Sequence, residues 1–189
     1  MLDRIIGALT FRDGIYQEVE NDPSFTGQAW LIVAVVGFLS QFGAVEADNI
    51  GLGLVSAAAH TVSVVLAFAV GAWVIAWTGR KFLNAPVDFG EMVRTMGLAY
   101  VWNITGLLGA LALLSPSLAV IAGPATAIGM LIGLVAWFVA VREALDLGVV
   151  PTLSVLILGV LIYYMLLIVL SFVLGAVGLA NAGLVGLFI

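Results

Sequence analysis

Two arginines stand at the ends of long apolar segments, each with a carboxylate at helical spacing. Glu91 precedes Arg94 by three residues, and Asp146 follows Arg142 by four. Residues three or four apart lie on one face of a helix, so each arginine can pair with its carboxylate. Their simplest role is to anchor helix ends at the lipid headgroups. The alternatives are a conformationally linked pair of charged corners and a docking surface for a cytoplasmic or membrane partner. The candidate contact surface is Arg80, Lys81, Glu91, Arg94, Arg142 and Asp146.

His60 is the only histidine, and it lies within a long apolar segment. An ionisable residue inside a membrane span is a functional candidate, because an imidazole can ligate a metal, a haem or a chlorin, or relay protons. Ser56, Thr61 and Ser63 offer His60 ordinary hydrogen-bond partners. A structural histidine is therefore the expectation, with metal or cofactor ligation as the alternative.

No group of residues has the spacing of a catalytic site. No apolar segment contains a nucleophile, a base and an acid together. Paired intramembrane aspartates and a phosphate-binding glycine-rich loop are absent as well. The chain has no cysteine, which excludes disulfides and thiolate metal sites. We therefore expect neither an enzyme nor a bound cofactor, and nucleic acid is not an expected partner.

The composition indicates that lipid is the main solvent of this chain. Of its 189 residues, 63% are hydrophobic and 9% are charged, whereas a soluble domain is about 25% charged. A helix crosses the ~30 Å hydrocarbon core with about 20 apolar residues. Five segments meet this length, at about 25–45, 51–78, 89–114, 118–141 and 151–174. We expect an all-α integral membrane protein with five transmembrane helices.

The chain divides into three regions on this reading. Residues 1–22 form an amphipathic interfacial or cytoplasmic segment of two short helices with a break near Gly14. Residues 23–175 form the five-helix transmembrane domain. The apolar tail, residues 176–189, is too short to cross again, so we expect the helix to break at Gly175 or Gly178 and the tail to lie at the interface or fold back on the bundle.

Three helix starts carry capping signals. The stretch that begins at Thr10 has the spacing of a capping box. Asp22 can cap a helix that begins at Pro23, where the missing N–H of proline costs nothing. Asp88 and Glu91 can form a capping box for the third span.

Polar and small residues within the spans predict helix packing. Asn103 lies in the middle of the third span, where an amide commonly bonds across to a neighbouring helix. Gly129 and Gly133 lie on one face of the fourth span, and small residues there let helix backbones approach closely. This face can serve packing within the chain or dimerisation.

The basic residues predict the orientation of the bundle. All six lie in segments that the five-span arrangement places on the same side, and the positive-inside rule assigns that side to the cytoplasm. The N-terminus is then cytoplasmic and the C-terminus is outside. The residues are Arg4, Arg12, Arg80, Lys81, Arg94 and Arg142.

Four segments together carry a resemblance to a known family. They are FRDGIYQEVENDP at 11–23, TGQA at 26–29, FGEMVRTMG at 89–97 and AVREALD at 140–146. In this order they resemble the bacterial branch of the Yip1 domain family. The resemblance implies a five-span protein of the bacterial inner membrane with a cytoplasmic N-terminus. It gives a fold and little indication of activity.

Departures from the family limit what is carried over. Proline, which bacterial members often have near the position of Trp102 or Asn103, is absent from this part of the chain. The Asp-Leu-Tyr-Gly-Pro motif of eukaryotic relatives is absent as well. Their association with small GTPases in vesicle traffic is therefore not transferred.

The expected function is contact and not catalysis. The chain has almost no soluble mass, so we expect a membrane organiser or an accessory subunit of a larger membrane complex. Its expected partners are membrane lipids and other integral membrane proteins or a second copy. One alternative is a small transporter or channel with a hydrated cavity that reaches His60 or Asn103. A further alternative is a membrane subunit that ligates a cofactor through His60.

Overall fold

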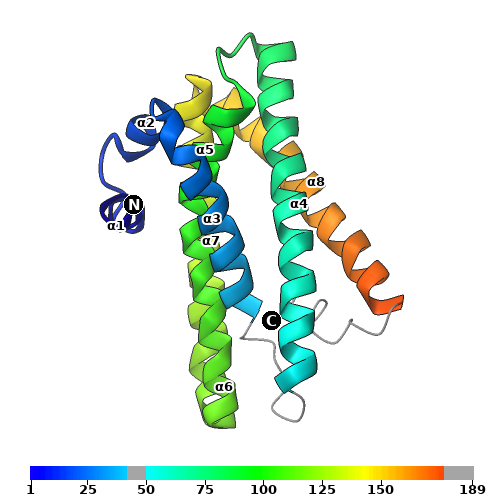
Figure 1. The fold of residues 1–189 in the computed structure, drawn as a ribbon. Coiled ribbons are helices and arrows are strands. Elements are labelled where there is room, and N and C mark those ends of the chain that lie inside the picture. The colour runs from blue at the N-terminus through cyan, green and yellow to red at the C-terminus, as the bar shows by residue number, and fades with distance from the viewer. Residues whose placement is uncertain (42–49, 177–189) are drawn as a thin grey trace.

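The computed structural model describes residues 1–41 and 50–176, and every regular element in these ranges is a helix (Figure 1). The label η denotes a 3₁₀ helix. The elements are α1 (Leu2–Leu9), α2 (Ile15–Glu20), η1 (Pro23–Phe25), α3 (Thr26–Ser40), α4 (Ile50–Leu83), α5 (Phe89–Ala99), η4 (Tyr100–Ala110), α6 (Leu111–Leu114), α7 (Pro116–Leu145) and α8 (Val149–Ala176).

Four helical segments of the described chain are long and apolar enough to cross a membrane. They cover Pro23–Ser40, Gly53–Leu83, Val120–Leu145 and Val149–Ala176. Their mean hydropathy rises from 1.4 in the first to 2.8 in the last. The structure is therefore an all-helical bundle of the kind found in multi-pass membrane proteins.

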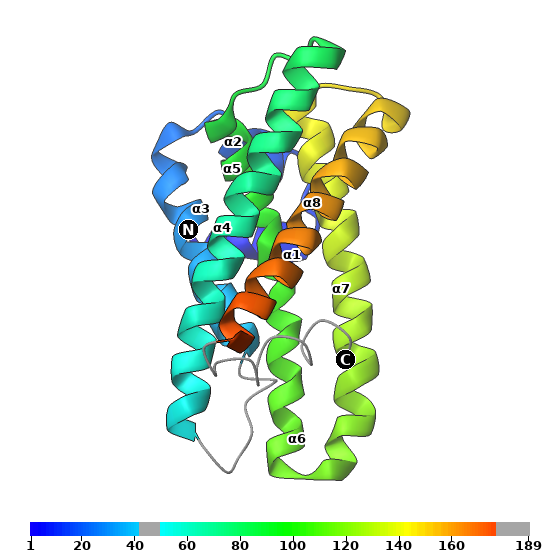
Figure 2. The same cartoon turned by 90° about the vertical axis from the view of Figure 1, so that its right-hand side faces the viewer.

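The third predicted span, residues 89–114, is divided into α5, η4 and α6. η4 is a 3₁₀ helix of 11 residues, whereas such runs rarely exceed three or four residues. The side chains of Asn103 and Thr105 bond to the carbonyl groups of Tyr100 and Trp102, three residues back, at 3.2 and 3.0 Å. Bonds of this kind compete with regular α-helical bonding. The three elements still follow one another along a single line in the bundle (Figure 2).

The long helices alternate in direction. α3, the α5–η4–α6 run and α8 point toward one end of the bundle, and α4 and α7 point toward the other (Figure 1). Small residues bring neighbouring backbones together. A Cβ on Gly97 would lie 2.9 Å from the Cβ of Ala29 on α3, and a Cβ on Gly159 would lie 2.3 Å from the side chain of Ile75 on α4. The glycines therefore allow α5 to pack on α3 and α8 to pack on α4.

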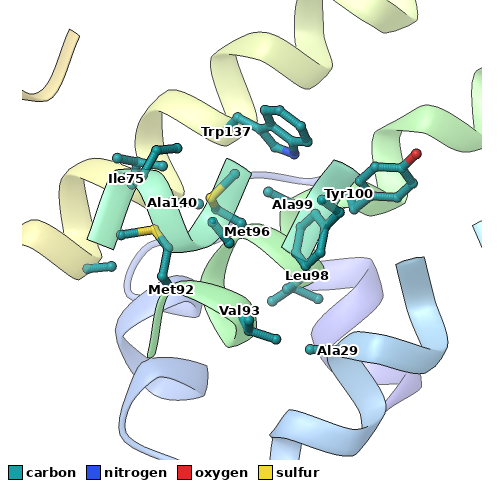
Figure 3. Packing of buried hydrophobic residues seen from close by; sticks show 14 of the residues in the cluster. Ala29, Ile75, Met92, Val93, Met96, Leu98, Ala99, Tyr100, Trp137 and Ala140 are labelled. Atoms are coloured by element: carbon teal, nitrogen blue, oxygen red, sulfur yellow. The ribbon is translucent and has the colours of Figure 1, made fainter. Parts of the chain in front are cut away.

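The core is built around α5 and its continuation into η4, where nearly every residue from Met92 to Val101 is buried (Figure 3). Aromatic rings link this run to the surrounding helices. Tyr100 has its ring centroid 5.9 Å from that of Phe68 on α4, and its hydroxyl lies 3.2 Å from that of Tyr163 on α8. Trp137 on α7 has its ring centroid 6.2 Å from that of Tyr100. One central run thus contacts three of the long helices.

Two of the three predicted helix starts are confirmed. Asp22 accepts a hydrogen bond from the backbone N–H of Ser24, and Pro23 occupies the first helical position. Asp88 and Glu91 form the reciprocal capping box at the start of α5.

The prediction for Thr10 was wrong, because Thr10 ends α1 and does not start α2. Its hydroxyl donates to the carbonyl groups of Ile6 and Gly7, so it bonds back to the helix that it closes. α2 begins after Gly14, whose φ of 70° is in the left-handed region.

The ends of two predicted elements fall partly outside the described residues. α8 continues to Ala176, so the helix does not break at Gly175. Gly178 and the rest of the predicted tail lie outside the described ranges, as do residues 42–45 at the end of the first predicted span.

Candidate functional site at the charged end of the bundle

α4 and α7 finish and α5 begins at the same end of the bundle (Figure 1), and charged residues occur at these helix ends. α2 packs there against both α5 and α7. We call this region the charged end. It contains all six residues of the predicted contact surface together with Glu20 and Glu143: Glu20, Arg80, Lys81, Glu91, Arg94, Arg142, Glu143 and Asp146.

Arg94 is buried, with 7% of its surface exposed, and it fastens α2 to α5. Its Nε donates to the carbonyl oxygens of Val19 and Glu20 at 3.1 and 3.0 Å, and Nη2 also donates to Glu20. Nη1 lies 3.4 Å from the hydroxyl of Thr26. The last carbonyl groups of a helix have no partner within it, and a cation is favourable at that terminus. Arg94 therefore satisfies the C-terminal end of α2.

The expected Glu91–Arg94 and Arg142–Asp146 ion pairs are absent from the described part of the chain, where Arg4 and Arg12 form the ion pairs. The Glu91 carboxylate instead accepts the backbone N–H of Asp88 at 2.6 Å. Asp146 lies beyond the last residue of α7, with a left-handed φ of 51°. Helical spacing alone therefore did not predict the partners of either arginine.

The segment formed by residues 1–22 is held together by its own ion pairs. Arg4 binds Glu18 and Asp22, both at 2.8 Å. Arg12 binds Asp3 at 2.9 Å and Glu18 at 3.0 Å. These contacts join α1 to α2 and to the start of the first span, and they neutralise both arginines.

Trp102 on η4 provides a second attachment for this segment. Its indole N–H lies 3.4 Å from the carbonyl oxygen of Ala8, and its ring stacks on Phe11 with centroids 5.8 Å apart. Ala8 is fully buried. Sequence reasoning missed this contact, because nothing local to Trp102 indicates a partner more than 90 residues away.

Glu20 faces three other carboxylates at the charged end. Burial is the main cause that raises its pKa to about 7, followed by the negative charges of Asp146, Glu91 and Glu143, while Arg94 opposes the shift. Sequence reasoning missed this residue because it lies in a run of acidic residues that has the composition of an exposed helix.

We expect the attachment of α2 to weaken as the pH rises from about 4.5 to about 7. The folded state holds a proton on Glu20 in this range and the unfolded chain releases it, so stability is greatest below the ordinary pKa and is lost on approach to the raised one. Because Glu20 is only partly buried, solvent screening reduces the expected loss to about 1 kcal/mol. The protection of amides 15–20 measures it, once each exchange rate is divided by the intrinsic rate at the same pH.

Glu20→Gln should make the protection of the α2 amides, which is their exchange rate relative to that of an unstructured chain at the same pH, independent of pH over this range. Asp13→Asn is the matched control, since Asp13 is an exposed carboxylate for which the described structure shows no hydrogen bond or ion pair. It should retain the wild-type pH dependence. An unchanged pH dependence in Glu20→Gln would contradict the assignment.

The six cations fall into two groups. Arg4, Arg12 and Arg94 have protein partners, as described above. The others are exposed, and the described structure gives them no ion pair or hydrogen bond: Arg80, Lys81 and Arg142. The second group is available to a partner or to lipid headgroups.

His60 is buried on α4, with 5% of its surface exposed. Its Nδ1 has no hydrogen-bond partner in the described structure. Thr61 and Ser63 bond instead to the carbonyl groups of Ala57 and Ala59 in their own helix. No cluster of three or more metal-ligating side chains occurs among the described residues.

The packing residues of the fourth span contact η4 of the same chain. A Cβ on Gly129 would lie 2.3 Å from the hydroxyl of Thr105, and a Cβ on Gly133 would lie 3.3 Å from the Cβ of Trp102. Asn103 bonds within its own segment, contrary to the expected bond across helices. That role falls to Thr126, which donates to the Thr105 carbonyl at 3.1 Å.

Comparison of the chain with protein-family models, with curated proteins and with solved structures gives no match. The resemblance of residues 11–29, 89–97 and 140–146 to the Yip1 domain family therefore stays a prediction.

Proposed function

We propose that this chain is a five-span protein of the bacterial inner membrane that acts by contact, as a membrane organiser or an accessory subunit of a larger membrane complex. It has no enzymatic activity of its own in this proposal. Its partners are other integral membrane proteins or a second copy, together with membrane lipids. Membership of the bacterial branch of the Yip1 domain family is part of the same proposal.

One observation carries the proposal: three segments of the Yip1-like pattern meet at the charged end. Arg94, from the segment 89–97, donates to two carbonyl groups of the segment 11–23. Glu20, from that same segment, faces Glu143 and Asp146 of the segment 140–146. The residues that carry the resemblance thus form one surface, although they lie far apart in the sequence.

A fifth crossing by α5–η4–α6 is supported by length and packing. At the usual rise per residue the run extends about 44 Å, which exceeds the ~30 Å hydrocarbon core. It lies beside α3 in the same direction and beside α7 in the opposite one. Five alternating crossings, with four of the six basic residues at the charged end, favour a cytoplasmic N-terminus and an outer C-terminus.

A single thiol tests both the orientation and the contact, because the chain has no native cysteine. In Lys81→Cys, a membrane-impermeant reagent should label the thiol from the cytoplasmic face, and a short bifunctional reagent should link it to a partner or second copy in stoichiometric yield. Ser117→Cys is the control at the opposite end, where the exposed residue lies in the first turn of α7. It should label from outside.

Two results would overturn the proposal. Labelling of both thiols from the same side would exclude this arrangement of spans. A monomer that forms no crosslink at position 81, and that purifies alone in mild detergent, would exclude function by contact at the charged end.

A further inference from the structure

One face of α4 changes from aliphatic to aromatic to cationic toward its C-terminal end. Positions three or four residues apart share a face of a helix. The seven side chains that form this face of α4 are all exposed. The face contains Val62, Leu66, Val70, Trp73, Trp77, Arg80 and Lys81. Its order of side chains matches the change from hydrocarbon to headgroup that a lipid-facing helix meets.

The aromatic part of this face is a connected cluster. The rings of Trp73 and Trp77 stack with centroids 6.1 Å apart, and Phe82 lies edge-on to Trp77 at 5.6 Å. All three are exposed, Phe82 to 65%. Indole rings combine an apolar body with a polar N–H, and they favour the boundary between hydrocarbon and water.

The cationic part lies just beyond the tryptophans. Lys81 follows Trp77 by one helical turn, about 5–6 Å along the axis. The end of α4 projects past the neighbouring helices (Figure 1, Figure 2). No carboxylate of the described chain pairs with Arg80 or Lys81. The two charges are therefore free to meet an anion from the surroundings.

We propose that the end of α4 formed by Trp73, Trp77, Arg80, Lys81 and Phe82 binds the headgroups of anionic phospholipids. The two cations attract the lipid phosphate and its net negative charge, and the aromatic cluster fixes their depth at the interface. This inference does not depend on the protein partner proposed above.

The segment formed by residues 1–22 provides a contrast within the same chain. α1 also exposes apolar side chains, including Leu2 and Ile6. Both arginines of the segment, however, are held by Asp3, Glu18 and Asp22, so it offers no unpaired cationic side chain to a headgroup. Preference for anionic lipid should come from α4 and not from α1.

Quenching of tryptophan fluorescence by brominated lipids tests the proposal on the full chain. The protein is reconstituted in phosphatidylcholine vesicles with an equal amount of phosphatidylglycerol, and bromine is carried by one lipid or by the other. We expect phosphatidylglycerol to quench Trp73 and Trp77 with a relative binding constant about 5-fold or more above that of phosphatidylcholine, since a cation near the surface contributes on the order of that factor. The preference should fall as salt is raised.

Three variants identify the residues responsible. Trp73→Phe with Trp77→Phe gives the signal of the other tryptophans, which is subtracted. Arg80→Gln with Lys81→Gln should remove the preference, whereas Arg12→Gln should leave it unchanged. Equal quenching by the two lipids in the wild-type protein, or a preference that survives the Arg80 and Lys81 substitutions or high salt, would overturn the proposal.

Discussion

Arg94→Ala is expected to detach the segment formed by residues 1–22 from the bundle. The guanidinium holds the last carbonyl groups of α2 from a buried position on α5. Hydrogen bonds to a charged group contribute about 1.5–3 kcal/mol, and their loss leaves buried carbonyl groups without a partner. Amide exchange in α2 should therefore rise about 30-fold, as a change of about 2 kcal/mol requires. Exchange in α4, α7 and α8 should change little.

Two further variants separate this attachment from a general effect of charge. Arg94→Lys keeps the charge but lacks the planar fork of donors, so its exchange should lie between wild type and Arg94→Ala. Arg142→Ala removes a cation for which the described structure shows no bond, and α2 should stay protected. Wild-type exchange of α2 in Arg94→Ala would show that other contacts hold the segment.

Gly129→Ala is expected to separate α7 from η4 and to lower the free energy of unfolding by about 1–3 kcal/mol. The added Cβ would lie within 2.5 Å of three side-chain atoms of Thr105. Thr105 cannot easily move aside, because its branched side chain is stiff and its hydroxyl is bonded to the Trp102 carbonyl. The measurement is unfolding in a mixed-detergent titration, followed by tryptophan fluorescence.

Gly27→Ala, in the first turn of α3, is the control. Apart from its chain neighbours and its own helix, a Cβ on Gly27 would meet no atom within 4 Å, so the substitution should only remove the conformational freedom of glycine and stabilise the helix by about 0.5–1 kcal/mol. The two alanine variants should therefore shift stability in opposite directions. Equal shifts would show that Gly129 does not control the packing of α7 on η4.

The sequence predicted features that depend on neighbouring residues. The apolar segments follow from composition and length, and four of them appear as helices of sufficient length. The caps at Asp22 and Asp88 depend on residues within three positions. Local chemistry decides these features, so one sequence was enough to predict them.

Features that depend on distant residues could not be predicted. The carbonyl partners of Arg94 lie 74 and 75 positions away, and helical spacing suggested Glu91 in their place. Glu20 acquires its raised pKa only when α5 and α7 bring their carboxylates to it. The 3₁₀ winding of η4 also depends in part on a tertiary contact, because the Thr105 carbonyl accepts a hydrogen bond from Thr126 on α7.

The 3₁₀ winding makes η4 longer, and turns the chain further about its axis, than α-helical winding of the same residues would. Each 3₁₀ residue advances about 2.0 Å and turns about 120°, against about 1.5 Å and 100° in an α-helix. Over the 11 residues of η4, α-helical winding would shorten the run by about 5 Å and turn one end relative to the other by more than half a revolution. Gly97 on α5 and Gly106 on η4, which both lie against α3, could then no longer face it together. The pitch of this one segment sets how far α6 reaches and which side it presents.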